Sequence, residues 1–169
     1  MTSTLQWIEA KFKTNPQEYK VFVMHLLKGD VAKFIEKLKS YLDASASYFD
    51  SASKQAELLY NGFMWGLFAS SVNEDYFVEK ERETGERRAD LLIIPKETAP
   101  YPYAFILEYK IATKSEDLKK VAQAALHPIE TKKYDSKIKM YKHVEKIIHL
   151  GLAFSEKNVE AAYQINLKV

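Results

Sequence analysis

The segment that most constrains this chain runs from Glu81 to Lys110, where a Pro-containing connection joins two short apolar runs. The first run, Leu91–Ile94, follows directly after Asp90. The second run, Ala104–Leu107, leads into the triplet Glu-Tyr-Lys that ends at Lys110. Short apolar runs bounded by turn residues are typical of buried strands. The sequence therefore predicts two buried strands that each carry charge at one end.

The charged ends of these two strands are expected to meet. Successive side chains of a strand alternate between its faces, so Glu108 and Lys110 point the same way, roughly 7 Å apart. If the two strands pair, Asp90 reaches the same margin of the sheet. Two carboxylates and an ammonium group placed there can hold a hard divalent cation and activate water at a phosphodiester. The pattern thus indicates a site for metal-dependent hydrolysis.

An acid two residues before a lysine is not distinctive by itself, because it occurs six times in this chain. Even the triplet Glu-Tyr-Lys occurs twice, the second time at Glu18–Lys20. The alternative interpretation is that Glu108 and Lys110 are the solvated polar end of a strand. Only this pair ends an apolar strand and follows a strand that is led by an aspartate, which favours the site.

Composition limits the class of protein. The chain has 169 residues, 47% of them apolar, which suits one domain or one domain with a helical arm. Cysteine is absent, so disulfides and thiolate metal sites are excluded. No signal peptide or apolar run of membrane length is present, so we expect a cytoplasmic protein that does not enter a membrane. The net charge of +2 would require a local basic patch for nucleic-acid binding.

The rest of the chain shows the periodicities of both helices and strands. Helical spacing predicts a short helix before Pro16 and then helices at about 16–27, 31–42, 57–70 and from Thr113 or Ser115 to about residue 129. Further strands are predicted at 76–78 and 146–154, a hairpin connection at 83–86, and a short helix or edge strand at 158–167. Asp30 is expected to cap the helix at 31–42, and Pro128 to kink or end the helix in which it lies.

This order of helix, strand, hairpin, Asp, strand, Glu-x-Lys, helix and strand resembles the PD-(D/E)xK nuclease superfamily. More narrowly, it resembles the nuclease-like domain that commonly follows an AAA-ATPase-like domain in bacterial proteins. The matching segments are LLKGDVAKFIEKLKSYL, ELLYNGFMWGLF, ETGERRADLLIIP, FILEYK, AALHPIETKKY and IIHLGLAFSEKNV, which together cover about residues 21–160. The resemblance implies an α/β fold with a small central mixed sheet flanked by helices, the restriction-endonuclease-like core. We place this core at residues 54–169 and a helical extension at residues 1–53.

The resemblance also implies roles for individual residues. Asp90 and Glu108 match the family's metal ligands, and Lys110 matches its catalytic lysine. Glu57 falls where the family often has a helical glutamate, which adds a ligand or orients a metal-bound water. The alternative for Glu57 is an exposed acid in the first turn of a helix, where its charge suits the helix dipole.

Two departures from the family pattern bear on activity. The usual Gly-Arg-x-Asp loses its glycine but keeps the arginine as Arg88. Pro128 stands where the family has a glutamine that faces the site, while Tyr134, further along, is retained. His127 is either a replacement polar group or an ordinary surface residue. Two alternatives therefore remain: an active nuclease, or a decayed nuclease-like module that binds protein or nucleic acid.

For the active form, Asp90, Glu108 and the carbonyl oxygen of Tyr109 are expected to hold one Mg²⁺ or Mn²⁺. Lys110 is expected to position the attacking water or to stabilise the charge that develops on the phosphate. Contacts with nucleic acid are expected from further basic and aromatic side chains, namely Arg87, Arg88, Lys114, Lys119, Lys120 and Tyr134.

The expected partners follow from the same interpretation. The substrate is nucleic acid, which we expect to be DNA, with an RNA- or structure-directed nuclease as the alternative. An AAA-ATPase-like domain in cis or in trans is a second expected partner, and this chain has no phosphate-binding P-loop of its own. The amphipathic helices within residues 4–42 either pack on the core or expose an apolar stripe that forms a homodimer.

Overall fold

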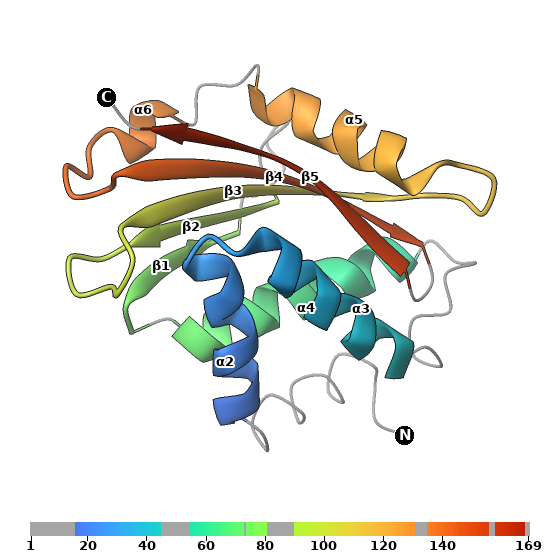
Figure 1. The fold of residues 1–169 in the computed structure, drawn as a ribbon, viewed down its shortest axis with the longest axis horizontal. Coiled ribbons are helices and arrows are strands. Elements are labelled where there is room, and N and C mark those ends of the chain that lie inside the picture. The colour runs from blue at the N-terminus through green and yellow to red at the C-terminus, as the bar shows by residue number, and fades with distance from the viewer. Residues whose placement is uncertain are drawn as a thin grey trace.

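The computed structural model describes residues 16–44, 55–72, 74–80, 90–130, 135–155 and 158–167. At its centre lies a five-stranded sheet with helices on both faces (Figure 1). The strands, which follow one another in space as they do in sequence, are β1 (Tyr76–Glu79), β2 (Leu91–Pro95), β3 (Tyr103–Ile111), β4 (Lys146–Ser155) and β5 (Asn158–Leu167). All neighbours are antiparallel except β3 and β4, which are parallel. The predicted α/β fold with a mixed sheet is confirmed, and the tail is an edge strand.

The helices form one layer on each side of the sheet (Figure 1). The first layer contains α2 (Pro16–Leu27), α3 (Val31–Ala44) and α4 (Gln55–Val72). The second contains α5 (Leu118–Glu130) and the single turn α6 (Asp135–Ile138). Parallel strands cannot be joined by a tight turn, and α5 provides the crossover from β3 to β4. This connection places α5 against β4 and the strands on either side of it, β3 and β5.

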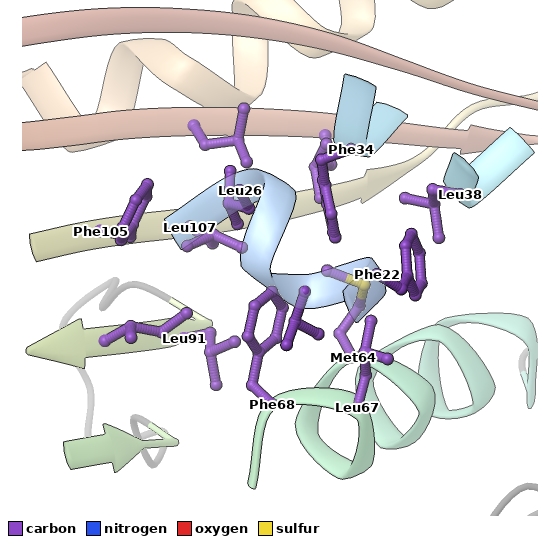
Figure 2. Packing of buried hydrophobic residues seen from close by; sticks show 14 of the residues in the cluster. Phe22, Leu26, Phe34, Leu38, Met64, Leu67, Phe68, Leu91, Phe105 and Leu107 are labelled. Atoms are coloured by element: carbon purple, nitrogen blue, oxygen red, sulfur yellow. The ribbon is translucent and has the colours of Figure 1, made fainter. Parts of the chain in front are cut away.

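The alternation of side chains along the strands divides the core in two. Leu91 and Ile93 of β2 join a cluster with α2, α3 and α4, in which Phe22, Phe34 and Phe68 are fully or almost fully buried (Figure 2). Leu92 and Ile94 point to the other face and join Ile138 of α6 there. Because both faces of β2 are covered, the strand is apolar throughout, as expected for a central strand.

The apolar faces of α2 and α3 belong to this core. The ring of Phe22 on α2 stacks on that of Phe34 on α3, with the centroids 5.1 Å apart. On the outer side of α3, Lys39 Nζ donates a hydrogen bond of 3.0 Å to Glu160 Oε1 on β5. The division of the chain at residue 53 stays a prediction. The short helix predicted before Pro16 and the hairpin predicted at 83–86 lie outside the described residues.

Asp30 caps α3 as predicted. Its Oδ1 accepts a hydrogen bond of 3.1 Å from the backbone N–H of Lys33, and Gly29 supplies the positive φ (95°) that turns the chain between α2 and α3. We expect Asp30→Ala to lower the free energy of unfolding by about 1 kcal/mol, measured by urea denaturation, because that N–H loses its acceptor. Asp30→Asn keeps an acceptor oxygen and should retain most of the stability. Equal losses in both variants would contradict this role.

The predicted start of the helix after β3 is wrong. The helix begins at Leu118, not at Thr113 or Ser115. Thr113 N–H donates to Glu116 Oε1 (2.9 Å), which closes a separate turn. Asp117 then caps the helix, since its Oδ1 accepts from the backbone N–H of Lys119 at 2.9 Å. At its other end α5 continues through Pro128 to Glu130, so the proline does not end the helix.

Candidate active site

Glu108 and Lys110 lie inside the central strand of the sheet. The sequence led us to expect Glu108 and Lys110 at the end of this strand, and β3 does include both and continues to Ile111. Glu108 is level with Gly151 of β4, and Lys110 with Ala153. Both side chains leave β3 on the face of Ile106, which is the face covered by α5 and α6. The two charged groups are therefore partly enclosed and do not end in open solvent.

Asp90 is hydrogen-bonded to the two residues of β3 that flank Glu108. Its backbone N–H donates a hydrogen bond of 3.0 Å to the carbonyl oxygen of Leu107. Its carboxylate Oδ2 accepts a hydrogen bond of 2.6 Å from the backbone N–H of Tyr109. The second bond is short, as expected for a charged acceptor. The two predicted acids are thus brought together where β2 begins and β3 runs on past it.

The helix α5 covers the strand next to Glu108. A Cβ atom added to Gly151 would lie 2.4 Å from the carbonyl oxygen of Ala122 and 2.6 Å from the backbone nitrogen of Leu126. The backbone of α5 therefore rests directly on β4 at the level of Glu108. Glu108 is only half-exposed, and its Oε2 atom is withdrawn from solvent. A negative charge in such a position favours a nearby cation.

Tyr109 points to the opposite face of the sheet. Its ring meets that of Phe154 edge-on at 6.1 Å, and its hydroxyl is buried. Burial raises the pKa of this hydroxyl well above its ordinary value, and the negative charge of Asp90 raises it further. Tyr109 is therefore neutral across the physiological pH range. Its side chain packs in the core, while its backbone N–H donates the hydrogen bond to Asp90.

A turn with an acidic residue follows Lys110. The pKa of Glu116 is lowered, first by the hydrogen bond from the backbone N–H of Thr113, then by that from the Thr113 hydroxyl, and less by the charge of Lys110. Sequence analysis placed Glu116 in the first turn of a helix and missed its position beside the site. The spacing Thr-x-x-Glu usually marks the start of a helix, which is why sequence analysis placed Glu116 there.

The predicted nucleic-acid contacts are described only in part. Lys114 lies in the turn after β3, and Lys119 and Lys120 lie in the first turn of α5, all three exposed. His127, on the same helix, is exposed as well. Glu57 lies on α4, but its side chain is outside the described part of the structure. The remaining three predicted contacts, Arg87, Arg88 and Tyr134, lie outside the described residues.

The oxygen atoms near Asp90 and Glu108 suit a hard cation. Among the described residues, no group of three or more His, Asp or Glu side chains gathers in a way that could hold a metal. The described donor set is instead a pair of carboxylates with the main-chain oxygen atoms of β3 beside them. Mg²⁺ is commonly held through one or two carboxylates and otherwise by water, so the residues present fit such an ion.

Comparison with known families agrees with this geometry. A model of the PD-(D/E)XK nuclease superfamily matches residues 55–163, which is more than half of the chain. The chain belongs to this superfamily. The matched range contains β1 to β4, α5 and most of β5, and with them Asp90, Glu108 and Lys110. No curated protein matches the chain. No helix in the described part of the chain has the length and hydropathy needed to span a membrane.

Proposed function

We propose that this protein is a metal-dependent nuclease that hydrolyses phosphodiester bonds, and that its substrate is DNA. One observation carries the proposal: Asp90 donates a hydrogen bond to the carbonyl oxygen of Leu107 and accepts one from the backbone N–H of Tyr109, which holds this acid against β3 on both sides of Glu108. Lys110 leaves the same strand on the same face as Glu108. Membership of the superfamily supports the same assignment.

Asp90 and Glu108, with the carbonyl oxygen of Tyr109, are the residues that would hold the ion, Mg²⁺ or Mn²⁺. When bound, such an ion polarises the phosphodiester and lowers the pKa of a coordinated water. The backbone N–H of Tyr109 fixes the orientation of the Asp90 carboxylate before any ligand arrives. This preorganisation limits the rearrangement needed when the substrate binds.

Lys110 has the role of positioning the attacking water and stabilising charge on the phosphate. Lys110 leaves β3 two residues after Glu108 and on the same face, so its ammonium group can lie beside a phosphate that the ion holds. We therefore assign it electrostatic stabilisation of the transition state rather than proton abstraction.

The backbone of the DNA would be held by the exposed lysines around this face. Lys114, Lys119 and Lys120 all belong to the turn after β3 or to the start of α5. Their ammonium groups could contact backbone phosphates, with the acids Glu116 and Asp117 lying between them in the sequence. We include Arg87, Arg88 and Tyr134 in this surface and Glu57 in the metal site on the family resemblance alone.

The second candidate is a catalytically decayed module that binds protein or nucleic acid, such as a partner of an AAA-ATPase-like domain in cis or in trans. Pro128 favours it, since this residue lies within α5 where the family has a glutamine that faces the site. A proline cannot supply the amide group that the glutamine would. The set Asp90, Glu108 and Lys110 favours the active form, because a decayed site has no reason to retain all three.

The test is cleavage of supercoiled, linear duplex and single-stranded DNA, and of RNA, with Mg²⁺, with Mn²⁺ or with EDTA. We expect cleavage of DNA with either ion and none with EDTA. Titration calorimetry with Mn²⁺ should show saturable binding in the millimolar range or below. Equal cleavage in EDTA would contradict the mechanism. Absence of both cleavage and saturable Mn²⁺ binding would establish the decayed module instead.

A further inference from the structure

The last strand, β5, is an edge of the sheet and is covered over only half its length. Its first half lies against the helices: Val159 is fully buried, and Glu160 is held by Lys39 of α3. The second half leaves this cover. Tyr163 is 50% exposed, Ile165 47% and Leu167 72%, which makes them three of the most exposed large apolar side chains in the described part of the chain.

These three side chains share one face of the sheet. In the pairing of β5 with β4, Tyr163 is level with Leu150 and Ile165 with Ile148, and both β4 residues belong to the core beneath α2, α3 and α4. The alternation along a strand puts Leu167 on the same face. The three side chains therefore form an apolar stripe that extends the main core to the free edge of β5.

The edge of β5 lacks the features that keep sheet edges apart in monomers. Natural edge strands are short, or carry charge, proline or a bulge, because unpaired backbone groups attract another strand. The seven residues from Ala161 to Leu167 contain no charged residue and no proline. By contrast β1, at the other edge, has four residues, and Lys96 Nζ lies 5.0 Å from the ring centroid of its exposed residue, Phe77.

We propose that β5 pairs antiparallel with β5 of a second copy of this chain, about a two-fold axis through Gln164. A two-fold axis perpendicular to the sheet places corresponding helical layers of the two copies on the same face of the joined sheet. Two residues that lie opposite each other across the axis must therefore point to that same face, so their numbers are both odd or both even. In the register centred on Gln164, Tyr163 lies opposite Ile165 of the partner subunit, and Ala161 opposite Leu167 of the partner subunit. Each pair occurs twice, and the two sheets join into one.

The occupant is a second copy because the strand is complementary to itself. Aromatic and β-branched residues opposite each other are among the favourable cross-strand pairs, and this register forms two of them. The residues that face each other in this register, 161–167 of each copy, carry no charge, so no like charges oppose one another there. The inference does not depend on the proposed nuclease activity.

The absence of cysteine gives a direct test of the register. Gln164→Cys places the two introduced thiols on the axis, within the range of Cα separations that a disulfide bridges. We expect mild oxidation of the full chain to yield a covalent dimer. Phe77→Cys, on the exposed face of the other edge strand, is the matched control and should form no covalent dimer under the same conditions. Cross-linking of both variants equally, or of neither, would overturn the proposal.

Sedimentation equilibrium tests the association itself. We expect a dimer for the wild-type chain and association weaker by about 100-fold or more for Ile165→Lys, which places two ammonium groups in the apolar stripe. Phe77→Lys should not change the dimer, and circular dichroism establishes that both variants are folded. A wild-type chain that stays monomeric over the accessible concentrations overturns the proposal. So does a dimer that Ile165→Lys leaves intact, since association would then use another surface.

Discussion

Glu108→Gln is expected to reduce metal-dependent cleavage by about 10³-fold or more, because it removes charge while keeping shape. The Oε2 atom of Glu108 is withdrawn from solvent, and Glu108 lies on β3 between the two residues that bond to Asp90. The measurement is the initial rate of DNA cleavage with saturating Mg²⁺ or Mn²⁺. Calorimetry with Mn²⁺ should show a parallel loss of affinity.

The matched control lies in the same chain. Glu18 precedes Tyr19 and Lys20 on α2, so the triplet Glu-Tyr-Lys recurs there with Glu18 and Lys20 exposed. Glu18→Gln should leave cleavage and Mn²⁺ affinity unchanged. We expect Lys110→Ala to abolish cleavage while retaining Mn²⁺ binding, since it is not a ligand. Full activity of Glu108→Gln would exclude the proposed site.

Gly151→Ala is expected to lower the free energy of unfolding by about 2 kcal/mol or more. The new methyl group would meet Ala122 O at 2.4 Å and Leu126 N at 2.6 Å, which are backbone atoms that cannot rotate away. Only a shift of α5 relative to β4 relieves this contact. Urea denaturation measures the change, and Gln123→Ala, on the exposed side of α5, should have little effect.

The same variant also tests whether the position of α5 matters for the site. Lys119 and Lys120 lie in the first turn of this helix, so a displaced α5 changes their distance from Glu108. At a temperature where Gly151→Ala remains folded, we expect weaker binding of DNA. Unchanged binding would mean that these lysines do not contribute to the substrate surface.

The strands could be predicted from the sequence because each contains a short apolar run that is bounded by polar or turn residues. The placement of Glu108 and Lys110 on one face near the end of β3, and of Asp90 next to that strand, also followed from these runs and the alternation of side chains. The partial burial of Glu108 did not follow, because charged residues usually mark a solvated end of a strand. Gly151 on the adjacent strand β4 lies level with Glu108, and the backbone of α5 packs against this glycine. Together they cover the position of Glu108.

The start of α5 could not be predicted for a different reason. Thr113 and Glu116 have the spacing of a capping box, and they do form its hydrogen bond, but the helix begins at Leu118. A local pattern therefore formed without the element that it usually announces. The close approach of α5 to β4 had only a weak sequence indication, a glycine inside an apolar run.

The hydrogen bond between Asp90 and Tyr109 N–H has a consequence for the choice of variants. The Asp90 carboxylate accepts a backbone N–H of β3 in the way that a peptide carbonyl oxygen of a neighbouring strand would. This one side chain therefore both joins the two strands and is a candidate ligand. The Asp90→Ala variant loses both the hydrogen bond to Tyr109 and the candidate ligand, so an inactive variant would not show which loss is responsible. Asp90→Asn preserves the acceptor and separates the two contributions, as Glu108→Gln does for the other acid by keeping its shape.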